Sequence, residues 1–118
     1  MAERPVSMAG PDRDGVIVLT WETLSNTDQT GAAVRVPSHA DKCVTATGTF
    51  GGTISLQGSN EDPPVNWHIL SDQAASAISL SAAGIAQVAE NPLFIRPAQT
   101  AGTVSDVDVI VVCSPRNQ

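Results

Sequence analysis

The sequence is poor in aromatic residues and in positive charge. Its 118 residues include two Trp, two Phe and no Tyr, and six Lys and Arg against twelve Asp and Glu, for a net charge of −6. Binding to DNA or RNA requires clustered cations that neutralise phosphates, or aromatic rings on which bases stack. We therefore expect no direct nucleic-acid partner, and the same charge balance disfavours an anionic membrane surface.

Long apolar runs and catalytic motifs are missing as well. No apolar run approaches the ~20 residues of a transmembrane helix, and the first ten residues carry Glu3 and lack the apolar segment of a secretory signal. His39 and His68 stand in no metal-binding spacing. The acids Glu61 and Asp62 lie in a predicted turn, where adjacent side chains point apart. We expect no catalytic residue, no metal and no cofactor, and the chain is not predicted to be an enzyme.

The two cysteines, Cys43 and Cys113, lie far apart in the sequence and in no metal-like spacing. We expect two reduced thiols that behave as small hydrophobic residues. A disulfide between them stays open as an alternative if the strands that carry them are neighbours.

The composition favours a fold made of strands. Only 15% of the residues are charged, fewer than the solvated faces of long helices need, and Val, Ile and Thr are plentiful. Short alternating segments recur every ~8 to 12 residues, a pattern typical of a β-sandwich or barrel in one domain. Residues 1–14 have no apolar period, so we expect an extended N-terminal arm followed by one domain over residues 15–118.

Two glycines divide the most regular part of the sequence. The segment GTFGGTISLQGS (48–59) contains two alternating runs that meet at Gly51 and Gly52. A Gly-Gly pair between alternating runs predicts a tight β-hairpin.

The segment DVDVIVVC (106–113) predicts the last strand. Its alternation places Val107, Val109, Val111 and Cys113 toward the core. Ile110 and Val112 then lie on the outer side, where we expect a neighbouring subunit or protein to cover them.

Trp67 is predicted to lie in the core, because large aromatic residues are usually buried. Arg96 is expected to form an ion pair with an acid of the sheet, within the chain or between subunits. The acids considered for this pair are Glu90, Asp106 and Asp108, and Pro97 is expected to end its strand.

Over residues 43 to 112 the sequence resembles a known family. The run GTFGGTISLQGSNEDPPVNWHIL, then SLSAAGIAQVAENPLFIRPAQTAGT and the alternating valine strand are similar to small virion proteins of tailed bacteriophages. The nearest kind is the head decoration, or cement, protein. The residues that carry the likeness have structural roles: Gly51, Gly52, Trp67, Arg96 and Pro97.

The resemblance implies an all-β, jelly-roll-like antiparallel β-sandwich of about eight short strands. It also implies a virion structural protein that binds the outside of a capsid and stabilises it at junctions between major capsid proteins, after assembly in the cytoplasm of a bacterial host. The chain would be a homo-oligomer, a trimer or alternatively a dimer. The partner contacts that we predict are Arg4, Pro5, Val6, Met8, Ile110 and Val112.

Two other functions remain open at this stage. The chain is alternatively a β-domain of the phage neck, tail or fibre, because related patterns occur in such proteins. A carbohydrate-binding module, with Trp21 or Trp67 as the stacking platform, is the weaker alternative, since sugar sites usually need several exposed rings.

Overall fold

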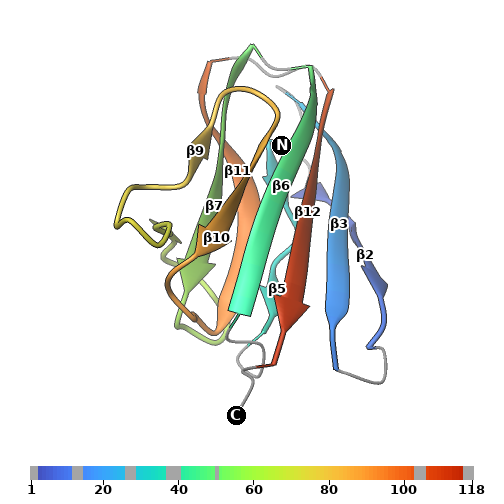
Figure 1. The fold of residues 1–118 in the computed structure, drawn as a ribbon, viewed down its shortest axis with the longest axis vertical. Coiled ribbons are helices and arrows are strands. Elements are labelled where there is room, and N and C mark those ends of the chain that lie inside the picture. The colour runs from blue at the N-terminus through green and yellow to red at the C-terminus, as the bar shows by residue number, and fades with distance from the viewer. Residues whose placement is uncertain are drawn as a thin grey trace.

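The chain folds into two β-sheets packed face to face (Figure 1). This computed structural model describes residues 3–11, 15–25, 29–36, 41–49, 51–102 and 106–115. Within those residues every regular element is a strand. The predicted all-β sandwich is therefore confirmed.

One sheet has five strands, in the spatial order β10-β6-β12-β3-β2, and all its neighbours are antiparallel. β12 is the central strand, so its outward side chains lie in the middle of the sheet. The strands are β2 (Val6–Ala9), β3 (Ile17–Leu24), β6 (Asp41–Thr49), β10 (Gly84–Val88) and β12 (Asp106–Ser114).

The other sheet has seven strands, of which β7 and β11 form the long central pair. Short strands extend it on both sides: β1, β4 and β5 lie beyond β11, and β8 and β9 lie beyond β7. The strands are β1 (Glu3–Arg4), β4 (Thr30–Gly31), β5 (Val34–Arg35), β7 (Gly52–Ser59), β8 (His68–Ile69), β9 (Ser79–Leu80) and β11 (Phe94–Gly102).

The connectivity is that of a jelly roll. The chain passes from one sheet to the other between β1 and β2, β3 and β4, β5 and β6, β6 and β7, β9 and β10, β10 and β11, and β11 and β12. Most sequence neighbours therefore lie in opposite sheets, and the exceptions that pair side by side are β2 with β3 and β7 with β8. This is the double-sheet arrangement by which an antiparallel fold builds a sandwich from eight strand positions.

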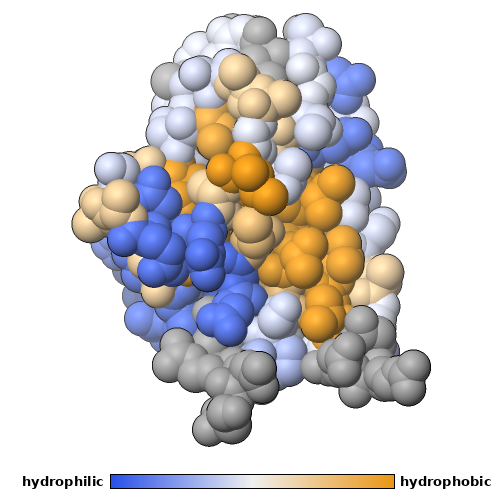
Figure 2. All heavy atoms as spheres, viewed as in Figure 1, coloured by the Kyte–Doolittle hydropathy of each residue, from blue (hydrophilic) through white to orange (hydrophobic). Residues whose placement is uncertain are grey.

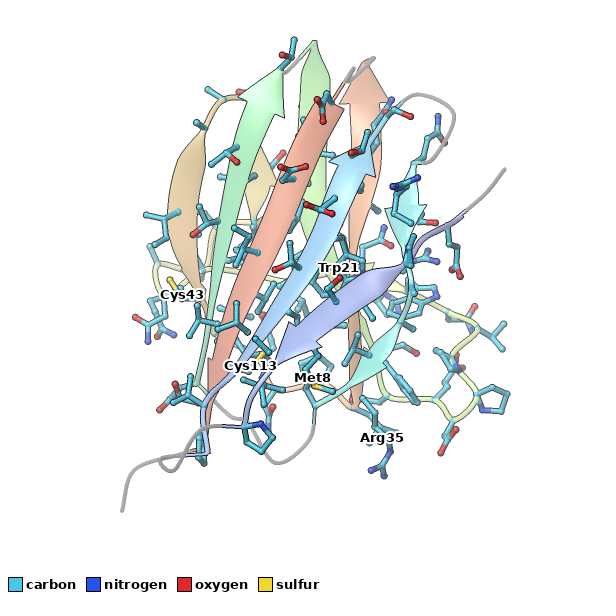
Figure 3. All side chains as sticks on the ribbon, turned by 90° about the vertical axis from the view of Figure 1, so that its right-hand side faces the viewer. Met8, Trp21, Arg35, Cys43 and Cys113 are labelled. Carbon is cyan, nitrogen blue, oxygen red and sulfur yellow. The ribbon has the colours of Figure 1, made fainter. Side chains whose placement is uncertain are left out.

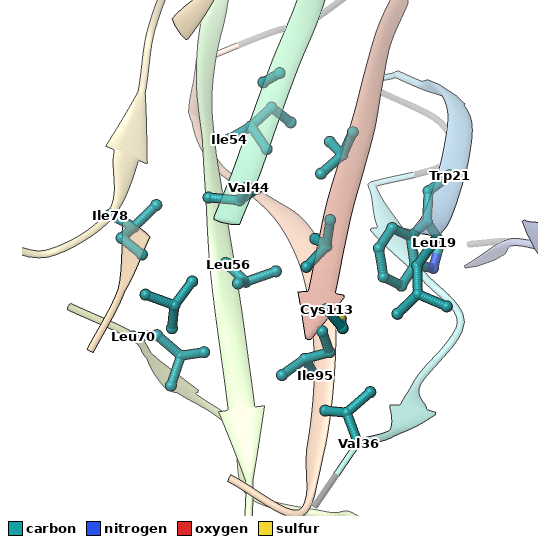
Figure 4. Packing of buried hydrophobic residues seen from close by; sticks show 14 of the residues in the cluster. Leu19, Trp21, Val36, Val44, Ile54, Leu56, Leu70, Ile78, Ile95 and Cys113 are labelled. Carbon is teal, nitrogen blue, oxygen red and sulfur yellow. The ribbon is translucent and has the colours of Figure 1, made fainter. Parts of the chain in front are cut away.

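Aliphatic side chains from both sheets fill the space between them (Figure 4). On β12 the predicted alternation is confirmed, since Val107, Val109, Val111 and Cys113 are all fully buried. Burial of an aliphatic side chain of this size contributes about 1.5–3 kcal/mol relative to exposure, so the valine strand is a main source of stability.

Trp21 is the largest side chain in the core. It is 0% exposed, and its indole N–H donates a hydrogen bond of 2.9 Å to the carbonyl oxygen of Ala32. Gly31 lies against the ring, because a Cβ atom at that position would stand 2.3 Å from Cδ1 of Trp21. The glycine of β4 thus leaves room for the indole of β3.

The hairpin prediction at Gly51 and Gly52 is wrong. These residues connect β6 of one sheet to β7 of the other, and the two strands do not pair with each other. Gly102, whose φ is +69°, lies close to this connection: a Cβ on it would stand 2.7 Å from the carbonyl oxygen of Gly51. Alternation located both strands and the turn, but it carries no information on which strands become neighbours.

The N-terminal segment is extended, as predicted, but it is not a free arm. Glu3–Arg4 forms β1, which pairs in parallel with β4, and Val6–Ala9 forms β2, which pairs with β3. Residues 3–9 therefore join the seven-stranded sheet to the five-stranded one along one side of the sandwich, and Figure 3 shows β2 crossing this side beside Met8. We call this segment the strap. Pieces of two and four residues are too short to show a period in the sequence.

Pro97 does not end its strand, contrary to prediction. β11 continues to Gly102, and Pro97 pairs with Leu56 of β7. On its other side β11 pairs with β5 at Phe94 and Ile95 and with β4 at Ala98, so Pro97 lies at the break between two short neighbours. A residue without a backbone N–H is tolerated where the ladder is interrupted.

Candidate interaction surface

The outer face of the five-stranded sheet carries apolar side chains from strands that are distant in the sequence. Cross-strand pairing aligns them in two rows, one centred on Ile110 of β12 and the other on Val112. The first row contains Ile85, Thr45, Ile110, Thr20 and Ser7, and the second contains Gln87, Cys43, Val112, Val18 and Ala9. We call these ten residues the valine–isoleucine face.

Neither row contains a charged residue. Charges begin in the next positions along the central strands, with Asp108 beyond the first row and Asp41 beyond the second. The backbone N–H of Thr23 donates a 2.9 Å hydrogen bond to Oδ1 of Asp108, which holds this carboxylate at the end of the face. An apolar centre with a polar rim is the usual anatomy of a protein–protein interface.

The face is open to solvent in the single chain. Ile85 is 69% exposed and Val112 is 39% exposed. Figure 2 shows hydrophobic side chains gathered over the region of β6, β12 and β3. The predicted outward placement of Ile110 and Val112 is confirmed. The topology brings Val18 and Cys43 beside Val112 and places Ile85 in the row of Ile110.

The other predicted contact residues lie in the strap. Val6 is partly buried and packs against the core. Nε of Arg4 donates a 2.7 Å hydrogen bond to the carbonyl oxygen of Glu22 in β3. Pro5 and Met8 are exposed. The structure thus places the six predicted residues on two parts of the surface, and it makes Val6 a structural residue.

The two cysteines point to opposite sides of the five-stranded sheet. Cys43 pairs with Val112 on the outer face, whereas Cys113 pairs with Lys42 on the inner face, and Figure 3 shows the two sulfur atoms apart. Both thiols are free. Burial raises the pKa of Cys113 to about 11, so this thiol is protonated and unreactive at neutral pH.

We therefore expect no disulfide within the chain. Protein purified without reductant and then denatured takes up two maleimide groups, because a bridge would require one strand to turn over. Mass spectrometry counts the groups. A denatured chain that takes up none until a reductant is added would contradict the placement of the two cysteines.

A pocket of about 660 Å³ lies on the other sheet, between the end of β7, the segment around β8 and the segment before β11. Its residues include Ser59, Asn60, Glu61, Trp67, Glu90 and Asn91.

Trp67 is only partly buried, so the prediction that it lies in the core is wrong, and Trp21 is the tryptophan of the core instead. The carbohydrate-binding alternative therefore depends on Trp67 alone.

Arg96 holds Trp67 in position. The guanidinium carbon lies 4.3 Å from the centroid of the Trp67 ring, and Nε donates a 2.9 Å hydrogen bond to Oε1 of Gln57. Burial lowers the pKa of Arg96, and the charge of Glu3 in the strap raises it.

The acids that were predicted to pair with Arg96 make other contacts: Glu90 accepts a hydrogen bond from the N–H of Ser71. Asp108 accepts one from Thr23, and the acid whose charge acts on Arg96 within the chain is Glu3.

The polar groups of the pocket support the surrounding loops. Oε1 of Glu61 accepts hydrogen bonds from the backbone N–H groups of Val65 and Asn66, and its Oε2 accepts one from the Asn66 side chain. These bonds lower the pKa of Glu61, with the Asn66 backbone as the largest cause. Oδ1 of Asn60 accepts a bond from the N–H of Leu93. Glu61 thus fixes the turn that precedes Trp67, and it is not part of an acid pair.

A buried lysine joins the pocket to the core. Lys42 is 1% exposed, and its ammonium donates a 2.6 Å hydrogen bond to Oδ1 of Asn91. Burial lowers the pKa of Lys42, and the neighbouring Cys113 and Asp41 raise it in part. Lysine is almost never fully buried without a partner, so sequence composition gives no warning of this placement. The signal lies in the alternation of β6, which puts Lys42 on the same side as Val44 and Ala46.

Among the described residues, no group of three or more His, Cys, Asp and Glu is arranged to hold a metal ion. His68 lies in the exposed β8, and His39 falls outside the described residues. No helix long and apolar enough to span a membrane occurs in the part of the chain that the structure describes.

No model of a protein family matches the chain, and no curated protein matches it. Among solved structures, protein NMB1881 from Neisseria meningitidis aligns at 13% identity and a TM-score of 0.44, over 92% of this chain and 83% of that one. A cupin-2 domain containing protein from Shewanella frigidimarina aligns at 11% identity and 0.44, over 94% and 79%. The K1 cleaved adhesin domain of Lys-gingipain from Porphyromonas gingivalis aligns at 8% identity and 0.43, over 97% and 85%. These weak likenesses do not bear on what this chain binds.

Proposed function

We propose that the protein is a structural component of a tailed-phage virion that binds the outside of the capsid at junctions between major capsid proteins. The observation that carries this proposal is the valine–isoleucine face, which exposes Ile85 and Val112 on a chain of net charge −6. Apolar surface of this kind is unfavourable in water, and assembly into an oligomer that covers it removes the cost.

Two further features support a role in assembly. The sequence of residues 43–112 resembles head decoration proteins, and the jelly-roll sandwich is a rigid body with its core closed by two sheets. A rigid oligomer whose copies each make a weak contact binds a regular lattice tightly, since the second contact forms at high effective concentration. Such a protein reinforces the joints of the shell without performing a reaction.

The test is co-sedimentation with expanded heads of the phage whose genome carries this sequence. Wild-type protein is expected to sediment with the heads at a fixed ratio to the major capsid protein. Ile110→Asp, in the middle of the face, should weaken binding by about tenfold or more, because it separates the copies of the oligomer and so removes their avidity. Ile69→Asp, an exposed isoleucine of the opposite sheet, is the matched control and should bind as the wild type does.

Gold-labelled antibodies on intact virions separate the head from the tail. Label over the whole head surface agrees with the proposal. Label confined to the neck, tail or fibres contradicts it and supports the alternative virion location. A wild-type protein that neither sediments with heads nor labels virions would remove the virion role altogether.

A further inference from the structure

We propose that a second copy of this chain covers the valine–isoleucine face, so that two five-stranded sheets pack face to face around a two-fold axis. This goes beyond the proposed function, because one copy can pair with another whether or not a capsid is the final target. It assigns the apolar face to the oligomer and leaves other surfaces for the shell.

Charge is the first argument for a second copy. A chain with twelve acids and six cations repels its own copies wherever acidic surfaces meet. The two rows of the face contain no charged side chain, and their flanking carboxylates, Asp108 and Asp41, lie beyond the rows at opposite ends of β6 and β12. Two copies joined here bury no charge and bring Val and Ile against Val and Ile. The face is complementary to itself, as an interface related by two-fold symmetry must be.

The position of β12 is the second argument. It is the third of five strands, so a two-fold axis through the middle of the face places β12 against its own copy. Ile110 and Val112 then meet their equivalents at the centre, where exclusion of water is most complete. The hydroxyl and amide groups of Ser7 and Gln87 lie on the edge strands, where they keep contact with water.

The two uncharged rows form a small contact. Five strands about 4.8 Å apart and two rows about 6.8 Å apart give on the order of 650 Å² buried in total, the size of a weak contact that forms as the protein concentration rises. A trimer would need two different surfaces on each copy, because a three-fold contact joins unlike patches. A single flat patch is sufficient for a pair.

Analytical ultracentrifugation of purified protein over a wide concentration range tests the pairing. Wild-type protein is expected to reach a mass twice the 12.2 kDa of one chain. Val112→Asp should raise the dissociation constant at least about a hundredfold, because it places two like charges against each other at the centre of the interface. Ile85→Asp, on a side chain that is 69% exposed, should weaken pairing without touching the core.

Two control variants test whether the loss of pairing is specific to the valine–isoleucine face. Val65→Asp and Ile69→Asp make the same changes at exposed positions outside the face, and both variants should remain paired. Thermal unfolding establishes that each variant is folded. If Val112→Asp does not fold, the dissociation constant of Ile85→Asp tests the pairing instead. Cys43 provides a second readout: its reaction with a maleimide should slow as the concentration of wild-type protein rises, because the second copy covers it.

Three outcomes would overturn the pairing: a wild-type chain that stays single at every concentration, face variants that pair as well as the wild type, or a stable mass of three copies. The proposed function and the pairing can fail independently of each other. A wild-type pair that ignores expanded heads would remove the capsid role and leave the pairing, whereas a single chain that decorates heads would do the reverse.

Discussion

Trp21→Ala is expected to lower the free energy of unfolding by about 3–5 kcal/mol, the range for truncation of a fully buried tryptophan. The side chain is enclosed between β3 and β4, and its indole N–H bonds to the carbonyl oxygen of Ala32. Truncation leaves a cavity beside Gly31, which has no side chain to move into the space. Urea unfolding followed by circular dichroism measures the loss.

Trp67→Ala is the matched control, since it removes the other tryptophan of the chain. Its ring is partly exposed and makes a cation–π contact with Arg96, so about 1 kcal/mol is expected to be lost. Equal losses for the two variants, or a larger loss at Trp67, would contradict the placement of Trp21 in the core and return Trp67 to it.

Removal of the strap has the second large expected effect. Deletion of residues 1–9 should lower the free energy of unfolding by at least about 3 kcal/mol, from the lost burial of Val6 and the lost hydrogen bonds of β1 and β2. It also leaves the eight residues of β3 as an unpaired edge, which favours aggregation. Thermal melting and light scattering measure the two consequences.

Met8→Ser separates the strap from its exposed side chain. Met8 is 61% exposed, so this substitution should leave the melting temperature almost unchanged. If the deletion melts at the wild-type temperature and scatters no more light, residues 1–9 are a free arm after all. In that case the prediction from sequence, an extended arm that contacts a partner, would be right.

Alternation predicted the parts of the fold that depend on a single strand. It gave the buried side of β12 and the outward placement of Ile110 and Val112, because the period of two follows directly from strand geometry. It did not give the partners of a strand. Gly51 and Gly52 look the same in the sequence whether the chain folds back on itself or crosses to the other sheet.

The sequence predicted only part of the valine–isoleucine face, because alternation does not give the partners of a strand. Val18, Cys43 and Ile85 come from three strands, and only the order β10-β6-β12-β3-β2 places Val18 and Cys43 beside Val112 and puts Ile85 in the row of Ile110. Residue type gave the wrong prediction at Trp67, where a large ring lies against a guanidinium instead of in the core. At Lys42 residue type gave no warning, since a lysine seldom occupies an inward position of a strand.

An electron cryomicroscopy reconstruction of the virion tests the central claim most directly. The account predicts sandwiches on the outer surface of the head, over joints between major capsid proteins, arranged in pairs with Ile110 and Val112 buried between two copies. A head surface that carries no such density, or sandwiches whose valine–isoleucine face is open to solvent, would contradict it.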